Sequence, residues 1–264
     1  MEKKSMFKTL IPTPLVLASV AVVALASPMA HASEAANKRI IDVPFSFEGP
    51  LGTYDKAALQ RGLAVYRQVC SACHSLKRVA YRNLEALGYT EDQVKAIAAE
   101  ATVMDGPNDA GEMFERPARP SDRFKSPFAN DKAAMAANNG ALPPDLSLIT
   151  KARHDGADYV YSILMGFAPA PHGVNVPEGK YYNRAMDGNI IAMPPPLSDG
   201  AVTYEDGTPQ LASQYAKDVA TFLTWAAEPE MEQRKQMGVK VMLFLVAFAG
   251  VMYAVKRQIW KKVH

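Results

Sequence analysis

Two cysteines and a histidine stand within five consecutive residues, Cys70-Ser71-Ala72-Cys73-His74, and these are the only cysteines in the 264 residues. The C-x-x-C-H spacing lets two thiols add to the vinyl groups of a haem while the next imidazole reaches the iron from the same face. We therefore predict one covalently bound haem c, attached at Cys70 and Cys73, with His74 as an iron ligand. The main alternative is a redox dithiol of the thioredoxin type, which requires a βαβ setting that the pattern does not indicate.

An electron-transfer haem needs a second axial ligand, and a methionine thioether gives a higher reduction potential than a second imidazole. Among 13 methionines, Met193 stands apart in Ile-Ile-Ala-Met-Pro-Pro-Pro, residues 190–196. Three prolines fix φ and stiffen the loop, which suits a side chain held against a metal without a helix. We predict Met193 as the second metal ligand, with Met186, His154 and His172 as rivals.

The N-terminal segment is typical of a secretory signal. Lys3, Lys4 and Lys8 precede a short apolar stretch, residues 15–26, and the small-x-small triplet at 30–32 supplies a cleavage site. Twelve apolar residues are too few to span a bilayer comfortably. We predict a signal peptide at 1–32 and a main domain on the periplasmic side of a bacterial inner membrane, covering 33–233.

The C-terminal segment has a different composition. Residues 237–255 are apolar except for Lys240, and as a helix they would reach roughly 28 Å, close to the thickness of a hydrocarbon core. Basic residues follow the span directly, which favours the cytoplasmic side for the tail. We predict a single transmembrane anchor at 234–256 in the lipid bilayer and a cytoplasmic tail at 257–264.

Charge is distributed unevenly along the chain. Residues 33–233 carry 19 Lys and Arg against 26 Asp and Glu, a formal charge of about −7, and the remaining basic residues lie near the two ends. An acidic body argues against nucleic-acid binding, which requires a basic face. It is suited to a basic partner protein, and acids cluster at 105–115 and 205–206.

Helical spacing of apolar residues predicts five helices in the main domain, at 54–69, 90–99, 131–137, 155–165 and 213–227. Thr90 and Gln93 form a capping-box pattern at the start of the second helix. Pro- and Gly-rich stretches at 104–128, 167–200 and 199–209 separate the helices, and strand signals are poor. The expected fold is mostly α with long irregular loops, which a large prosthetic group would help to organise.

Several segments together resemble the cytochrome c1 family. They include RGLAVYRQVCSACHS around the motif, ALPPDLS at 141–147, KARHDGADYVYS at 151–162, IIAMPPPLSDG at 190–200 and WAAEPE at 225–230, in family order. The resemblance implies a class I-like cytochrome c domain with a membrane anchor. It places the haem cysteines on Cys70 and Cys73 and the axial ligands on His74 and Met193. Extra cysteines that occur in some relatives are missing from this sequence.

The same resemblance implies two more residues at the haem and a set of partners. Arg153 matches an arginine that contacts a haem propionate, and Tyr159 matches an aromatic residue near the haem. The implied role is electron transfer within the quinol:cytochrome c oxidoreductase (bc1) complex. Electrons would pass from the Rieske iron–sulfur protein, beside cytochrome b, to a soluble basic c-type cytochrome. The subunit itself would break no substrate bond.

Two other readings of the same features stay open at the level of sequence. Another membrane-anchored monohaem cytochrome, either a free electron shuttle or an oxidase subunit, would share the haem motif and the anchor. A membrane-tethered thiol–disulfide oxidoreductase would share the two cysteines and the anchor, but it would carry no haem.

Overall fold

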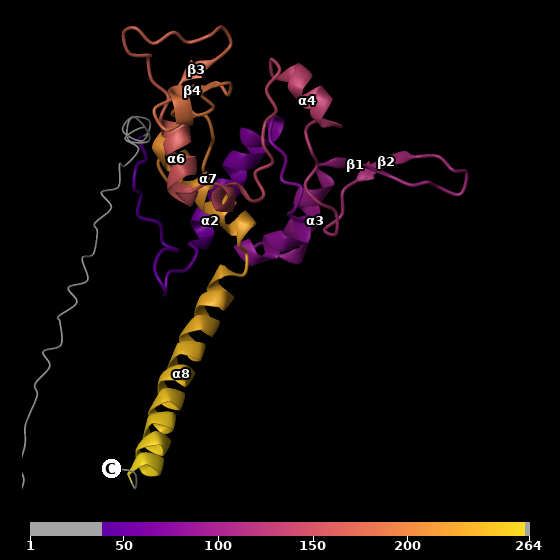
Figure 1. Ribbon diagram of the computed structural model, residues 1–264. Helices are drawn as coiled ribbons and strands as arrows, with labels where there is room; N and C mark the ends of the chain where they lie inside the picture. Colours follow the sequence, from indigo (N-terminus) through magenta and orange to yellow (C-terminus); the bar gives the residue numbers. More distant parts are fainter. Residues whose placement is uncertain (1–38, 262–264) are drawn as a thin grey trace, which may run out of the picture.

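The computed structural model describes residues 39–261, which form a mostly helical domain at one end of a long C-terminal helix (Figure 1). The predicted signal segment 1–32 lies outside the described residues. In chain order the elements are α2 (Lys56–Gln68), η1 (Cys70–Ala72), η2 (Tyr81–Leu87), α3 (Glu91–Ala99), β1 (Thr102–Asp105), β2 (Phe114–Pro117), α4 (Asp131–Ala137), α5 (Ile149–Ala152), α6 (Gly156–Met165), β3 (Tyr181–Tyr182), η3 (Asp187–Asn189), β4 (Ile190–Ile191), α7 (Ala212–Ala227) and α8 (Met231–Trp260).

All five helices predicted for the domain are present, as α2, α3, α4, α6 and α7, with ends within two residues of expectation. Their starts follow from local side-chain chemistry. The Asp55 carboxylate caps α2 by accepting hydrogen bonds from the N–H groups of Ala57 and Ala58. Thr90 and Gln93 form the predicted reciprocal capping box at α3.

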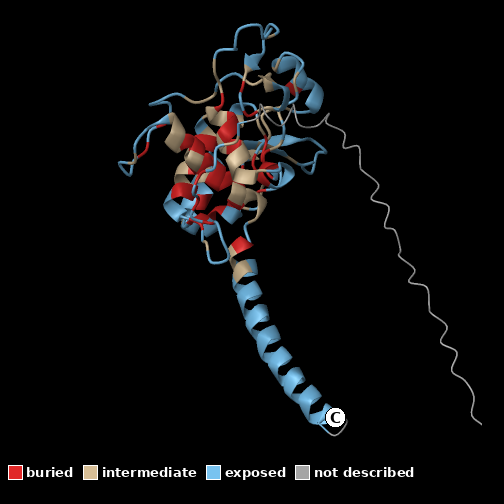
Figure 2. Ribbon diagram, turned by 60° about the vertical axis from the view of Figure 1, so that its left-hand side comes forward, coloured by how far each residue is buried: buried red, intermediate tan, exposed pale blue. Residues whose placement is uncertain are grey.

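The core is built around α2 and α7, which pack closely against each other, and α6 also packs against α7. Fully buried side chains such as Leu63, Tyr66 and Phe222 fill the space between the two helices. Gly62 allows the close approach, because a Cβ there would lie 2.1 Å from the backbone oxygen of Asp218. Figure 2 shows the buried residues concentrated in this part of the domain.

Two small antiparallel sheets were not predicted. Strands β1 and β2 pair from Thr102 with Pro117 to Asp105 with Phe114, and this hairpin projects from the side of the domain (Figure 1). Strands β3 and β4 pair over two residues each, directly before the predicted ligand Met193. Both sheets fall mainly in stretches expected to be irregular loops, although β1 begins at Thr102, two residues before the stretch 104–128.

Helix α8 extends away from the domain and is exposed along nearly its whole length (Figure 2). It begins before the predicted anchor 234–256 and continues beyond it. Within it lies a window with a mean hydropathy of 2.1, none of which is buried. Its 30 residues would span about 45 Å, so among the described residues it is the one helix long and apolar enough to cross a membrane.

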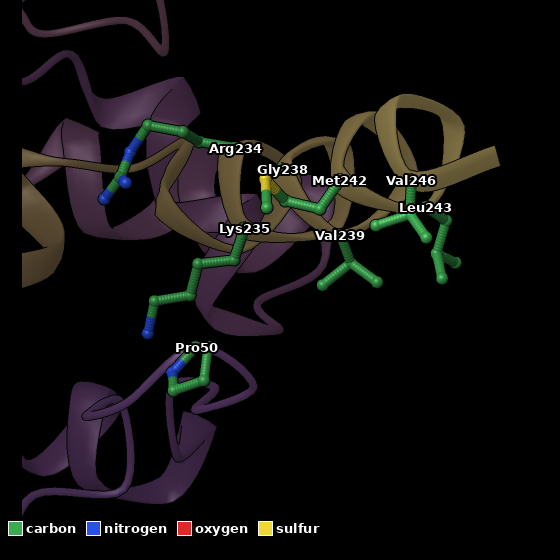
Figure 3. A pocket seen from close by; sticks show the side chains of 8 residues that line it. All are labelled: Pro50, Arg234, Lys235, Gly238, Val239, Met242, Leu243 and Val246. Carbon is green, nitrogen blue, oxygen red and sulfur yellow. The ribbon is translucent and has the colours of Figure 1, made fainter. Parts of the chain in front are cut away.

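The first turn of α8 is part of the domain. Met231 is buried, and the Glu232 carboxylate accepts a hydrogen bond from the backbone N–H of Tyr54 at 2.7 Å. The Lys235 ammonium donates to the backbone carbonyls of Phe47 and Gly52. Figure 3 shows Lys235 pointing toward the loop that carries Pro50. A groove continues from this joint along the helix, lined by Pro50, Arg234, Lys235, Gly238, Val239, Met242, Leu243 and Val246.

Candidate functional site

The C-x-x-C-H motif lies where α2 tightens into the 3₁₀ turn η1. The backbone N–H groups of Cys73 and His74 both donate to the carbonyl of Cys70, at 3.1 and 2.9 Å. Cys73 is the C-cap of this turn, and its thiol lies close enough to Cys70 to affect the pKa of the Cys70 thiol. Both cysteines are free thiols, Cys70 half-buried and Cys73 exposed.

The environment of Cys70 does not suit a redox dithiol. Burial, with a smaller contribution from Cys73, raises the pKa of the Cys70 thiol to about 12. Dithiol oxidoreductases depend on a cysteine whose pKa is lowered so that the thiolate forms near neutral pH. The sheets among the described residues are the two antiparallel pairs, so the parallel βαβ setting of such enzymes is not found there.

His74 is held in one tautomer. Its Nδ1 lies 2.8 Å from the carbonyl oxygen of Pro144, and because a carbonyl only accepts, Nδ1 carries the proton and Nε2 keeps a lone pair. Desolvation lowers the pKa of His74 and outweighs the opposite effects of Pro144 and Asp145. A neutral imidazole with a free Nε2 lone pair is the form that binds a metal.

The loop at 144–147 runs beside the residues that follow His74. The backbone N–H of Leu146 donates to the Ser75 carbonyl at 2.9 Å, and that of Arg78 donates to the Ser147 hydroxyl at 3.0 Å. The Asp145 carboxylate accepts from Ser75 and from the backbone N–H of Lys77, both at 2.8 Å. Desolvation alone would raise the pKa of Asp145, but the hydrogen bonds from Lys77, Ser147 and Ser75 outweigh it and lower the pKa.

Met193 follows the short strand β4 and is half-buried. The turn that leads into this strand is organised by Asn183, which is fully buried. Its side-chain amide donates to the carbonyl of Ile163 at 2.7 Å, and its side-chain oxygen accepts from the backbone N–H groups of Ala185 and Met186. The loop carrying Met193 is thus fixed by Asn183 on one side and by three prolines on the other.

Arg153 and Tyr159, the two further residues that the resemblance places near the haem, contact each other. The guanidinium carbon of Arg153 lies 5.8 Å from the centre of the Tyr159 ring, within the range of a cation–π contact. The Tyr159 hydroxyl lies 3.8 Å from the sulfur of Met186, so this group reaches the loop before Met193. Arg153 is exposed, which leaves its guanidinium accessible to a bound anion.

The rival histidine ligands lie in solvent. The His154 side chain is 96% exposed and its Nδ1 lies 3.1 Å from the Asp155 carboxylate. His172 is exposed in the loop before β3. Because both histidines are exposed, neither is favoured as the ligand of a buried metal. Met193, in contrast, is half-buried.

The donor set at the motif fits haem c, because two free thiols at a tight turn precede a neutral imidazole with a free lone pair. Comparison with known proteins places this chain in a family. The model of the cytochrome C1 family matches residues 45–263, nearly the whole of the described chain. The chain belongs to the cytochrome c1 family. The resemblance noted in the sequence is thereby confirmed.

Similar proteins include bacterial and mitochondrial members of the cytochrome c1 family. The chain is 49% identical over 235 residues to cytochrome c1 of Rhodospirillum rubrum, covering 83% of this chain and 86% of that protein. It is 50% identical over 243 residues to a mitochondrial cytochrome c1 heme protein of Solanum tuberosum, covering 92% and 74%. It is 52% identical over 242 residues to cytochrome b/c1 of Bradyrhizobium diazoefficiens, covering 83% of this chain but only 35% of that longer protein.

Two residues beside the predicted ligands were not predicted from the sequence as single residues. Asp145 lies inside ALPPDLS, a segment that carried the resemblance, but its carboxylate contacts residues about 70 positions earlier in the chain. Asn183 looks like an ordinary turn residue between Tyr182 and Arg184. Its burial is the only signal of its role, and burial is not visible in the sequence.

Proposed function

We propose that this chain is a haem-bearing electron-transfer subunit of a bc1 complex, built on a class I-like cytochrome c domain. The observation that carries the proposal is the tautomer of His74, which leaves Nε2 free in a residue that directly follows two free cysteines in a member of the cytochrome c1 family. A haem iron held by a nitrogen and a thioether supplies one-electron redox chemistry without an open coordination position.

Each residue of the site has one task in this proposal. Cys70 and Cys73 tether the haem covalently, and the turn between them sets the position of His74. His74, through Nε2, and Met193, through its thioether, would hold the iron. Arg153, held against the Tyr159 ring, donates charge-assisted hydrogen bonds to a haem propionate.

The partners proposed are cytochrome b and the Rieske iron–sulfur protein within the complex, and a soluble basic c-type cytochrome outside it. The electron enters from the Rieske protein and leaves to the soluble cytochrome. The relative from Bradyrhizobium diazoefficiens, named cytochrome b/c1, supports the association with cytochrome b. The formal charge of about −7 over residues 33–233 supports a basic acceptor.

The membrane placement proposed is a domain on the periplasmic side, an anchor formed by α8, and a cytoplasmic tail. The exposed apolar surface of α8 supports the anchor, since exposed Leu243, Phe244 and Val246 would be costly in water. Basic residues beyond the span support a cytoplasmic tail. A reporter that works only in the cytoplasm, fused after His264, should therefore be active.

The direct test is the fate of the haem in denatured protein. We expect haem to stay with the chain through acid-acetone extraction and to give a pyridine haemochrome of the two-thioether type. Cys70→Ala and Cys73→Ala should each change the spectrum to the one-thioether type or abolish attachment, while Ser71→Ala, which alters only a residue between them, should leave it unchanged. Haem released by extraction from the unaltered protein contradicts covalent attachment.

Assembly is tested separately by purification in detergent. A member of a bc1 complex should co-purify with a cytochrome b and an iron–sulfur protein in fixed proportion. A haem-bearing chain that purifies alone would instead be a free membrane-anchored shuttle.

A further inference from the structure

The carbonyl that fixes His74 is itself held in place by the residue that follows it. Pro144 presents its carbonyl oxygen to His74 Nδ1 at 2.8 Å. The next residue, Asp145, places one carboxylate oxygen 2.8 Å from the Ser75 hydroxyl and 2.8 Å from the backbone nitrogen of Lys77. Its other oxygen accepts from the backbone N–H of Ser147 at 3.0 Å. One carboxylate therefore joins the residues just after His74 to the loop that holds His74.

The geometry of the peptide bond makes this link directional. The carbonyl group of Pro144 and the nitrogen of Asp145 share one rigid plane, so the orientation of Asp145 determines where the Pro144 oxygen points. Pro143 and Pro144 have fixed φ angles, which leaves little other freedom in the loop. Three hydrogen bonds hold the Asp145 side chain, and two of them come from the segment that begins at His74.

We propose that Asp145 is a positioning residue for His74, acting through the carbonyl of Pro144. This inference rests on the proposed function, in which His74 binds the haem iron. Outer-shell acceptors fix the ring orientation of a metal-bound histidine and raise its basicity. A well-aimed carbonyl makes the imidazole a stronger donor, which stabilises oxidised iron and lowers the reduction potential.

The charge of Asp145 would act on the potential in the same direction, so the test must separate charge from position. Asp145→Glu keeps the charge but moves the carboxylate by one methylene, away from Ser75 and the backbone of Lys77. Asp145→Asn removes the charge and keeps the size, but its single side-chain oxygen can accept on one side only, so the variant loses either the bond from Ser147 or those from Ser75 and Lys77. Asp122→Ala is the matched control, because Asp122 also accepts a backbone N–H in its own loop, that of Arg119, but pairs with Arg116.

The experiment uses the full chain with its haem, purified in detergent, and measures two quantities. The first is the midpoint potential. The second is the solvent exchange rate of the His74 Nδ1 proton, followed by NMR in the oxidised protein. We expect Asp145→Glu, like Asp145→Ala, to raise the potential and to speed exchange by about tenfold, the factor that one hydrogen bond to a charged group is typically worth. Asp122→Ala should leave both quantities unchanged.

Other outcomes overturn the inference or the proposal beneath it. An Asp145→Glu protein with the potential and exchange rate of the unaltered chain would show that charge alone acts, and the positioning role would be wrong. If Asp145→Ala fails to mature, Asp145→Asn gives the same comparison, and unchanged proton exchange in it overturns the inference. An unaltered chain with no haem bound through His74 would instead refute the proposed function itself, which the haemochrome spectrum shows independently.

Discussion

The guanidinium of Arg61 on α2 donates two hydrogen bonds to the carboxylate of Asp218 on α7, from Nε to Oδ2 at 2.9 Å and from NH2 to Oδ1 at 3.1 Å. Asp218 is 1% exposed, and it also accepts from the Tyr204 hydroxyl at 2.9 Å and from Gln214 at 3.0 Å. A buried carboxylate with four donors joins the two central helices and ties the loop at 204–206 to them. Its satisfied hydrogen bonds offset the cost of burying the charge.

We predict that Asp218→Ala destabilises the domain by about 3 kcal/mol, because it leaves the Arg61 charge and the Tyr204 hydroxyl without their buried acceptor. Glu100→Ala is the control. It breaks the pair between Arg67 and Glu100, whose side chains are 34% and 60% exposed, and should cost less than about 1 kcal/mol. Denaturant unfolding of the two variants measures the difference. Equal losses would show that the buried pair contributes no more than a surface pair.

The neighbouring ion pair gives a prediction for pH. Hydrogen bonds from the backbone of Thr208 and then from Arg61 lower the pKa of Asp206 to about 2. A carboxylate whose pKa is lower in the folded state stabilises the fold above its unfolded pKa of about 3.9, and this contribution is lost as the pH falls through the folded value. Asp206→Asn should therefore be less stable than the unaltered protein at pH 7, and the difference should vanish between pH about 4 and about 2. A difference that is constant down to pH 2 contradicts the prediction.

The proposed thioether ligand is tested by two substitutions of similar volume. Met193→Leu should remove the low-spin thioether spectrum and lower the midpoint potential substantially, because leucine offers no ligand atom. Met186→Leu is the matched control from the same loop, since its sulfur contacts the Tyr159 hydroxyl. It should keep the low-spin spectrum. The reverse pattern would assign the ligand to Met186.

The contacts between the domain and the first turn of α8 determine where the chain can be truncated without destabilising the domain. A chain ending after Gln236 keeps the buried Met231 and the bonds made by Glu232 and Lys235, whereas a chain ending after Glu230 loses all three. We expect both to be released from the membrane with haem attached. The shorter chain should be less stable by about 3 kcal/mol, the combined effect of one buried methionine and its accompanying hydrogen bonds. Thermal unfolding of the two soluble domains provides the comparison, and equal midpoints would mean that the first turn of α8 contributes nothing to the domain.

The helices were predictable because their signals are local. Apolar spacing placed α2, α3, α4, α6 and α7, and Thr90 with Gln93 marked the start of α3 without any knowledge of the rest of the chain. The haem attachment at Cys70, Cys73 and His74 stays a prediction, and it rests on a local signal of the same kind, the spacing within the motif.

The rest of the site depends on contacts that the sequence does not display. Asp145 meets Ser75 and Lys77 across about 70 residues, and no short-range pattern encodes such a contact. Strands β1 and β2 have only four residues each, and their sequences contain charged residues and a proline instead of a clear alternation. They pair through backbone hydrogen bonds and the ion pair of Arg116 with Asp105, and Arg116 also pairs with Asp122 in the loop after β2.

The hairpin β1–β2 also changes the expectation for docking. Of the four acids predicted to cluster there, Asp105 is neutralised by Arg116, which leaves Asp109, Glu112 and Glu115 exposed on a projecting element (Figure 1). A projecting acidic surface can attract a basic protein over a Debye length of about 8 Å at physiological salt. Such attraction raises the encounter rate without making a tight complex, which suits rapid turnover.

We therefore predict that electron transfer to a basic c-type cytochrome slows steeply as ionic strength rises. Changing Asp109, Glu112 and Glu115 together to Asn or Gln should lower the second-order rate constant at low salt by about tenfold and flatten its salt dependence, because steered association depends on these charges. The same change at Glu85, Asp131 and Glu178, which are exposed acids elsewhere on the domain, is the control and should have a much smaller effect. Stopped-flow oxidation of the reduced protein gives the rate constants. If both triple variants slow the reaction equally, the net charge of the domain attracts the acceptor, and the charges of the hairpin contribute no more than those elsewhere. If neither triple variant slows the reaction and the rate constant does not depend on ionic strength, apolar contact directs docking instead.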